Sequence, residues 1–248
     1  MNQSNNNPFG GLKSEGLEAA RDVLGGGGAM DSGLYTGTIK LAYAGKSSGG
    51  AHSMTVVVDL EGREYRETLY VTNKQGQNYY EKAGKKNPLP GFTTANDLAL
   101  LSTGVPLNEQ EIEERVVKLY DFDAKAEVPT KVQAVVSMHG KPITLGILKQ
   151  IVDKNVKNEA TNTYVPSGET REENIIDKVF HAETGKTVSE FTLKVENAEF
   201  QGKWGAKNKG VTRDRSTGKA GKVGAPGQKA ANDAIGGGQK QASKSLFG

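Results

Sequence analysis

Cysteine is absent from the 248 residues of the chain, which excludes disulfide bonds, thiolate zinc sites and cysteine nucleophiles. Long apolar runs are missing too, since no stretch approaches the roughly 18 residues that cross a bilayer as a helix. The polar, uncharged start from Met1 to Asn7 does not resemble a signal peptide. We therefore expect a soluble cytoplasmic protein with no membrane partner.

The sequence also lacks a complete phosphate-binding loop. Gly45-Lys46-Ser47 and Gly185-Lys186-Thr187 match only the end of that motif. A P-loop needs a further glycine five positions earlier, where this chain has Lys40 and Phe180. We interpret both triplets as hairpin turns.

Metal-binding and catalytic clusters are equally scarce. The three histidines are scattered, and His181-Ala182-Glu183 has none of the cysteines that complete a zinc deaminase site. Asp121 and Asp123 could hold Mg²⁺, but no further carboxylates lie at a recognisable spacing. We therefore predict that the protein is not an enzyme and has no cofactor and no metal site.

Glycine is abundant, with 32 residues, and unbroken runs at Gly25–Gly28 and Gly236–Gly238 lie near the two ends. Such runs bury too little surface to offset the entropy lost on ordering the backbone. We therefore predict three parts. They are a flexible arm over 1–32 that could contain a helix between Ser14 and Leu24, a folded domain over 33–204, and a disordered tail over 205–248.

Positive charge is concentrated near the C-terminal end. From Gln201 onward there are ten Lys or Arg residues and two Asp, a net charge of +8, whereas the whole chain is +3 and residues 1–200 are −5. A cationic segment joined to a mildly acidic domain predicts a polyanionic partner such as nucleic acid. The segment closes on Leu246 and Phe247 before a final glycine, which predicts a peptide that docks on a partner protein.

Alternating apolar and polar residues predict an antiparallel meander of three strands near residues 34–43, 54–60 and 65–71. We expect a polar loop over 73–87, a helix over 95–102 capped by Thr94, and later strands near 115–120, 131–137, 143–152 and 174–181. Residues 155–171 read as a loop, and 198–207 as a final helix carrying Trp204. This order predicts a mainly β protein, a single OB-fold-like antiparallel β-barrel with short accessory helices. The core side chains expected from the first two strands are Tyr35, Ile39, Leu41, Tyr43, Met54, Val56, Val58 and Leu60.

Cations and tyrosines share the polar side of these strands and the nearby loops. Lys and Arg follow phosphates, and aromatic rings stack on bases at roughly 1–3 kcal/mol per base, so the pattern is typical of single-stranded DNA binding. Tyrosines on strands and lysines in loops are also common in proteins that bind no nucleic acid, so the prediction depends on the group. The predicted DNA-binding residues are Lys40, Lys46, Arg66, Tyr70, Lys74, Tyr79, Tyr80, Lys82, Lys118 and Tyr120.

Five blocks of sequence (33–43, 65–73, 88–94, 116–121 and 174–181) and the Ser-Leu-Phe-Gly end resemble bacteriophage single-stranded DNA-binding proteins. The resemblance implies an OB-fold and sequence-independent DNA binding in phage replication, recombination or repair, in the host cytoplasm. It also implies a tail that contacts replication or recombination proteins. Many such proteins end in an acidic tail, whereas this tail is basic, so direct contact between tail and DNA is expected instead.

A second interpretation remains open, in which the chain is a structural or scaffolding protein of a virus particle. Glycine-rich arms that hold neighbouring subunits suit that role equally well. Size-exclusion behaviour without DNA distinguishes the two, because scaffolding predicts large regular assemblies. The sequence does not decide the oligomeric state, and a homo-oligomer is one of the alternatives.

Overall fold

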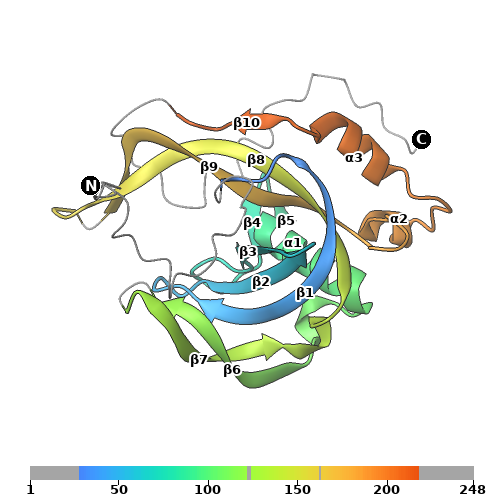
Figure 1. Ribbon diagram of the computed structural model, residues 1–248, viewed down its shortest axis with the longest axis horizontal. Helices are drawn as coiled ribbons and strands as arrows, with labels where there is room; N and C mark the ends of the chain where they lie inside the picture. The colour runs from blue at the N-terminus through green and yellow to red at the C-terminus, as the bar shows by residue number, and fades with distance from the viewer. Residues whose placement is uncertain (1–27, 122–123, 162, 218–248) are drawn as a thin grey trace, which may run out of the picture.

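The computed structural model describes residues 28–121, 124–161 and 163–217 (Figure 1). The helix predicted between Ser14 and Leu24, and the docking residues Leu246 and Phe247, lie outside this part of the chain. No helix within it is long and apolar enough to span a bilayer. The described chain is mainly β, as predicted, and its larger sheet is antiparallel apart from one short parallel pair.

The strands are β1 (Gly33–Lys46), β2 (His52–Leu60), β3 (Arg63–Tyr70), β4 (Tyr79–Lys82), β5 (Lys85–Pro88), β6 (Ile112–Asp121), β7 (Ala126–Val135), β8 (Pro142–Asn158), β9 (Thr163–Phe180) and β10 (Thr212–Asp214). The helices are α1 (Pro90–Thr103), α2 (Val188–Thr192) and α3 (Phe200–Asn208), with short 3₁₀ turns at Leu107–Glu109 and Val136–Met138.

The large sheet branches at β1 and β8, because each of them pairs with three other strands. The order β3-β2-β1-β8-β9 runs through it, with β10 parallel to β8 and the β7–β6 hairpin joined to the far end of β1. β3 and β9 are the outer strands of this series, and no backbone ladder joins them within the described residues. The predicted closure into a barrel is therefore not found, and the sheet stays open between β3 and β9.

The main core lies between strands β1, β2 and β3 on one side, strands β8 and β9 on another, and α1. Met54, Val56, Val58 and Leu60 of β2 enter it, as their spacing predicts. β8 is buried from Ile143 to Leu148, which agrees with its continuous apolar sequence. Full burial of one such side chain stabilises the fold by roughly 1.5–3 kcal/mol, so this cluster provides most of the driving force for folding.

A β-bulge at Lys40 changes the predicted facing of β1. Ile39 pairs with Val58 and Leu41 with Val57, so Lys40 is an extra residue between them. Before the bulge Ile39 faces the main core, but after it Leu41 and Tyr43 face the opposite side of the sheet, where they join a second apolar cluster. The prediction that all three share the core face is therefore wrong, because one inserted residue reverses the alternation.

A side chain and an N-terminal segment bridge the gap between β3 and β9. The Glu67 carboxylate on β3 accepts hydrogen bonds from the Ile176 N–H on β9, at 2.7 Å, and from the Tyr65 hydroxyl, at 2.6 Å. Burial raises the pKa of Glu67 to about 7, although both donors act to lower it. The Glu67 carboxylate thus links β3 to β9 by a hydrogen bond, where elsewhere in the sheet neighbouring strands are linked by backbone hydrogen bonds.

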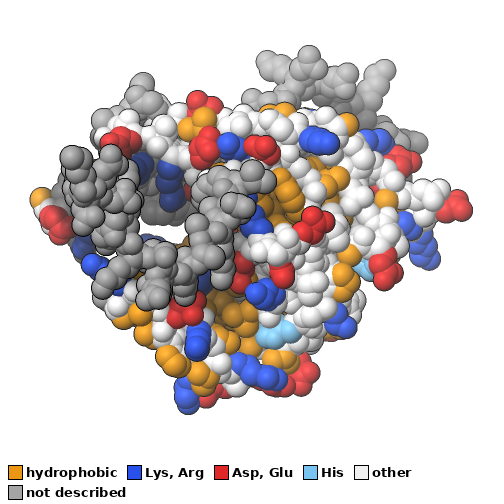
Figure 2. All heavy atoms as spheres, viewed as in Figure 1, with side chains coloured by type: hydrophobic (Ala, Val, Ile, Leu, Met, Phe, Trp, Pro, Cys, Tyr) orange, Lys and Arg blue, Asp and Glu red, His pale blue; other side chains and the backbone are white. Residues whose placement is uncertain are grey.

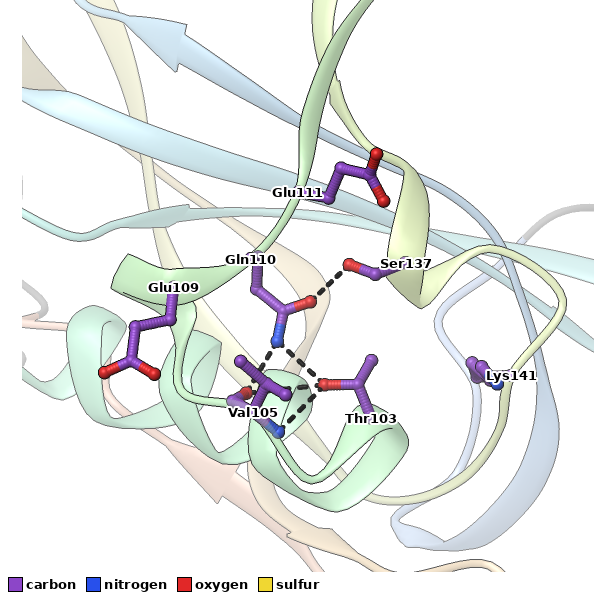
Figure 3. A pocket seen from close by; sticks show the side chains of 7 residues that line it. All are labelled: Thr103, Val105, Glu109, Gln110, Glu111, Ser137 and Lys141. Carbon is purple, nitrogen blue, oxygen red and sulfur yellow. Dashed lines mark hydrogen bonds between the residues drawn. The ribbon is translucent and has the colours of Figure 1, made fainter.

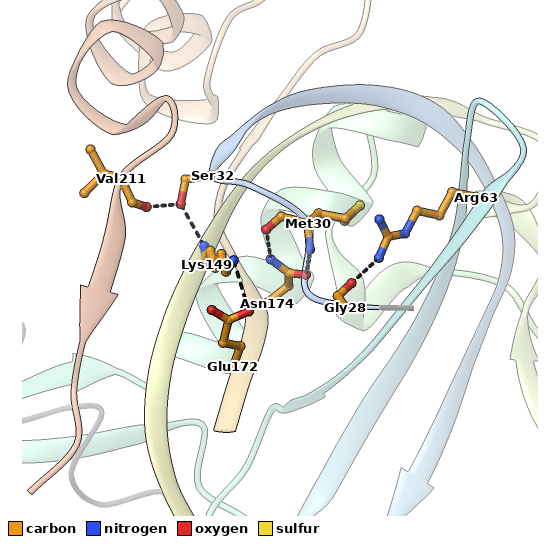
Figure 4. A network of polar contacts seen from close by, with 8 residues as sticks. All are labelled: Gly28, Met30, Ser32, Arg63, Lys149, Glu172, Asn174 and Val211. Carbon is orange, nitrogen blue, oxygen red and sulfur yellow. Dashed lines mark hydrogen bonds and ion pairs between the residues drawn. The ribbon is translucent and has the colours of Figure 1, made fainter. Parts of the chain in front are cut away.

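Residues 28–32 fill the rest of that gap (Figure 4). Arg63 donates to the Gly28 carbonyl at 2.6 Å, and Asn174 on β9 forms a pair of hydrogen bonds with the backbone of Met30, at 2.7 and 2.8 Å. The Ser32 hydroxyl accepts from the N–H of Lys149 at 2.7 Å and donates to the Val211 carbonyl. The end of the predicted arm is therefore part of the folded domain.

Two predicted loops are strands. Residues 73–87 contain the β4–β5 hairpin, whose turn at Ala83-Gly84 has φ values of 53° and 71°, as a type I′ turn requires. Much of 155–171 belongs to the ends of β8 and β9, which pair up to Asn158 and Thr163. This β8–β9 arm extends beyond the core, so both of its faces are solvated and its sequence carries no apolar alternation.

The helices predicted over 95–102 and 198–207 are present with shifted boundaries. α1 begins at Pro90, so Thr94 lies inside it and donates its hydroxyl to the Pro90 carbonyl instead of capping the helix. Gly185-Lys186-Thr187 is not a hairpin turn, because Thr187 caps α2 together with Glu190 in a capping box. α3 carries Trp204, as predicted.

The folded part continues beyond the boundary expected at residue 204. α3 extends to Asn208, and β10 pairs with β8 opposite residues 149–151. The Thr217 N–H and hydroxyl both donate to Asp153. Residues 205–217 are therefore anchored to the sheet, and the basic segment left beyond them begins at residue 218.

Candidate nucleic-acid interface

The face of β1, β2 and β3 that points away from the main core carries most of the predicted DNA-binding residues of these strands. Side chains on one face of a strand recur every second residue, so Glu64, Arg66, Thr68 and Tyr70 of β3 share this face. The bulge adds Tyr43 of β1 to it. We call the set Lys40, Tyr43, Arg66, Tyr70 and Lys74 the outer strip. The predicted residue Lys46 is not part of it, because Lys46 pairs with His52 and its side chain points to the same side of the sheet as Ala42 and Met54.

Arg66 and Tyr43 form the centre of the outer strip. The guanidinium carbon of Arg66 lies 5.9 Å from the centre of the Tyr43 ring, and its Nη2 donates to the Tyr43 hydroxyl. Tyr43 is 7% exposed, whereas Arg66 is exposed. A fixed ring beneath the guanidinium orients it, which leaves its outer side available to a phosphate or a base.

Lys40 stands at one end of the outer strip. Its ammonium lies 3.3 Å from Glu64, and both side chains are more than half exposed. An exposed ion pair of this kind contributes roughly 0–1 kcal/mol, so a phosphate can compete with Glu64 for the lysine.

Tyr70 and Lys74 form the other end. Tyr70 pairs with Ser53, and its side chain is 54% exposed. Lys74 packs its aliphatic carbons over the β1–β2 turn, where a Cβ on Gly49 would lie 3.1 Å from the lysine Cε. From Glu64 to Tyr70 is six residues along β3, so the strip is about 20 Å long at roughly 3.3 Å per residue.

The β4–β5 hairpin holds the next group of predicted residues. Lys86 lies 4.5 Å from the centre of the Tyr79 ring, and Tyr80 and Lys82 follow on the same strand. The hairpin is a separate two-stranded sheet that leads directly into α1. At the start of α1 a Cβ on Gly91 would come within 2.3 Å of the Tyr70 carbonyl, so only glycine lets the hairpin's base pack on the end of the outer strip.

Lys118 and Tyr120 do not lie with the outer strip. They alternate with Val117 and Leu119, as predicted, but those two residues belong to the second apolar cluster, on the same side of the sheet as Tyr43. Lys118 and Tyr120 therefore point to the opposite side from Arg66. The prediction assumed that the apolar side of β6 enters the main core, whereas it packs beside the outer strip.

Sequence reasoning missed two residues around this face. Tyr43 was assigned to the core, and only the bulge reveals its position. Arg115 shares the side of Val117 and forms an ion pair with Glu113 at 2.6 Å. Lys86 lies in the segment 73–87 that was expected to be a loop, and its place over Tyr79 depends on the hairpin pairing.

No group of three or more His, Asp or Glu residues is arranged to hold a metal ion within 28–121, 124–161 and 163–217. An open pocket of about 420 Å³ lies beside the end of α1, away from every predicted site residue (Figure 3). Three of its lining side chains are joined by hydrogen bonds: Gln110 donates to Thr103 at 2.7 Å and to the Val105 carbonyl at 2.6 Å, and Ser137 donates to Gln110. This network fastens α1 to the strands.

Trp204 lies away from the outer strip, on the β8 side of the molecule. It is 4% exposed, stands edge-on to Phe180, and donates its ring N–H to Asp177 at 2.7 Å. Its fluorescence should therefore report folding of the domain.

Basic and acidic side chains are interspersed over the face seen in Figure 2. The folded domain thus offers local cations beside aromatic rings, and no single strongly basic surface is visible in this view. The comparisons add no relative, since no protein-family model and no curated protein matches the chain.

Proposed function

We propose that the protein binds single-stranded DNA with little sequence preference, through the outer strip and the adjoining β4–β5 hairpin. The observation that carries this proposal is the alignment, on one face, of Arg66 held over Tyr43, the exposed ring of Tyr70, and Lys40 and Lys74. Alternating cations and rings along a strand of sheet suit a flexible polyanion whose bases can stack.

The sheet order supports an OB-type architecture for this function. In an OB-fold five strands wind as a partly open barrel, and the face of strands 2 and 3 with the loops 1–2 and 4–5 binds oligonucleotides. Here β1, β2, β3, β8 and β9 run in a comparable order, with α1 between the third and fourth. The outer strip then lies on the equivalent face, and the β8–β9 arm corresponds to the fourth loop.

The charge distribution supports a second contact through the basic segment beyond residue 217. Lys219, Lys222, Lys229, Lys240 and Lys244 would neutralise phosphates outside the strip. Leu246 and Phe247 would dock on a replication or recombination protein of the phage whose DNA the domain covers. Both roles extend the expectations that the sequence raises.

The decisive measurement is a fluorescence-anisotropy titration of a short labelled oligo-dT and of a duplex of equal length, at moderate salt. The single strand should bind at least tenfold more tightly, because only its bases are open to stacking. Equal affinity for the two would overturn the proposal.

Arg66→Ala and Tyr70→Ala should each weaken oligo-dT binding about five- to a hundredfold, as the loss of roughly 1–3 kcal/mol of stacking or phosphate contact implies. The matched controls are Lys131→Ala and Tyr120→Ala. Tyr120 is 50% exposed, close to the 54% of Tyr70, but it lies on the other side of the sheet. A control variant that weakens binding as much as Tyr70→Ala would remove the outer strip as the site.

A further inference from the structure

β6 has an open edge. It pairs with β7 along its whole length from Ile112 to Asp121, and no other strand of the described chain pairs with it. Figure 1 shows β6 at the lower margin of the molecule, with β7 between it and β1. A ten-residue edge strand offers a row of backbone donors and acceptors to another strand.

The pairing with β7 fixes which residues of β6 turn those backbone groups outward. The Val136 N–H donates to the Glu111 carbonyl at 3.2 Å, which marks 111 and 136 as a directly bonded pair. Such pairs alternate along an antiparallel ladder, so the odd-numbered residues of β6 bond to β7 and the even-numbered ones face outward. Pro129, which has no N–H, lies opposite Lys118. This agrees with the pattern, because an even-numbered residue of β6 receives no hydrogen bond from β7.

The outward-facing residues also carry the exposed side chains of one face. Ile112, Val116 and Tyr120 are 47%, 64% and 50% exposed. Glu114 and Lys118 lie between them and are exposed as well. In order these five residues read apolar, acidic, apolar, basic, apolar, which is self-complementary about Val116.

We propose that β6 pairs antiparallel with β6 of a second copy of the chain, about a two-fold axis at Val116. In that register Val116 meets Val116 of the other copy, each Glu114 meets a Lys118, and each Ile112 meets a Tyr120. All five pairs join outward-facing residues, so about ten backbone hydrogen bonds form. The interface is isologous, and the two sheets become one continuous sheet through the dimer.

Charge complementarity selects the second copy and the register. Sliding the strands by two residues places Glu114 opposite Val116 or Tyr120, and Lys118 opposite Ile112 or Val116, so every charge loses its partner. An odd shift sets outward backbone groups against inward ones and forms no ladder. The centred register therefore satisfies the backbone, the charges and the apolar pairs together.

The test is sedimentation velocity of the full chain without DNA, over a range of concentrations, which keeps it independent of the proposed function. The wild type should form a concentration-dependent dimer. Glu114→Lys and Lys118→Glu should each raise the dimer dissociation constant at least tenfold, because each sets like charges opposite one another at two places. The double variant Glu114→Lys/Lys118→Glu should return to within about threefold of the wild type, since both pairs are opposite again.

Two controls separate the edge from the rest of the hairpin. Glu127→Lys makes the same charge change on β7, away from the edge. Lys131→Ala removes the 2.9 Å contact that Glu114 makes within its own chain. Both should leave the dissociation constant unchanged. A wild type that stays monomeric, a dimer that tolerates both single swaps, or a double variant no better than the singles would overturn the proposal.

A cross-link tests the axis directly. Because the chain has no cysteine, Val116→Cys creates a single thiol, which can form a disulfide only with the same thiol of a second chain. Directly bonded antiparallel pairs hold their Cα atoms about 5.5 Å apart, within the range that a disulfide spans. Mild oxidation should convert most of this variant to a covalent dimer, while Glu127→Cys should stay monomeric under the same conditions. Equal yields for the two variants would contradict a two-fold axis at Val116.

Discussion

Glu67 gives a quantitative prediction about pH, which the substitution Glu67→Gln tests. Burial raises the pKa of its carboxyl from 4.5 to about 7. Between these values the folded protein holds a proton that the unfolded chain has released. The free energy of unfolding should therefore be highest below pH 4.5, as far as Glu67 is concerned, and should fall as the pH rises through 7.

The size of the effect follows from the shift. A rise of about 2.5 pKa units corresponds to about 3 kcal/mol, and the side chain's remaining contact with solvent reduces this to about 1–3 kcal/mol. Glutamine can accept the same hydrogen bonds from Tyr65 and Ile176 but does not ionise. Relative to the wild type, Glu67→Gln should gain about 1–3 kcal/mol between pH 4.5 and pH 8.

Urea denaturation followed by Trp204 fluorescence measures this difference, because the indole is buried in the folded domain. Burial also raises the pKa of Asp97, but that contribution is the same in both proteins and cancels. Backbone N–H donors, acting against burial, lower the pKa of Glu190 to about 2, so its stabilising effect is lost only below pH 4.5. The control is Glu64→Gln on the exposed face of β3. A Glu67→Gln difference that stays constant across the pH range would refute the reasoning.

Two further predictions concern the ends of the folded domain. Asn174→Ala leaves the N–H and carbonyl of Met30 without partners, so the free energy of unfolding should fall by about 2–4 kcal/mol in urea, and a loss below about 0.5 kcal/mol would contradict the bridging role. Truncation after Thr217 removes five lysines and none of the described residues, so it should flatten the dependence of log affinity for oligo-dT on log salt by up to about 3.5, at roughly 0.7 per phosphate contact. Phe247→Ala should leave the affinity and its salt dependence unchanged, and a large loss would show that the docking residue binds DNA.

The sequence predicts β2 and β3 well because their alternation is uninterrupted. Met54 to Leu60 enter the core at every second position, and Arg66 and Tyr70 face outward as expected. β8 is recognisable by its long apolar run. In each case local pattern and tertiary burial agree, so the pattern alone suffices.

Elements with two solvated faces leave no such pattern. The β4–β5 hairpin and the β8–β9 arm are stabilised by backbone pairing, and their polar sequences read as loops. The site is only partly predictable for a similar reason. Alternation places Lys118 and Tyr120 correctly relative to Val117, but which side of the molecule that face joins depends on how the β6–β7 hairpin packs. The gap between β3 and β9 is bridged by Glu67 and Asn174, and each of these side chains bonds to a residue more than a hundred positions away in the sequence.

The bulge at Lys40 divides β1 into two parts whose side chains of the same parity face opposite sides of the sheet. Ile39 and Tyr43 are only four residues apart, yet one belongs to the interior and the other to the surface proposed to meet DNA. Deleting Lys40 would exchange these assignments along half of the strand, so the position should tolerate no change in length. Variation among natural versions of this chain should accordingly show insertions or deletions only outside β1.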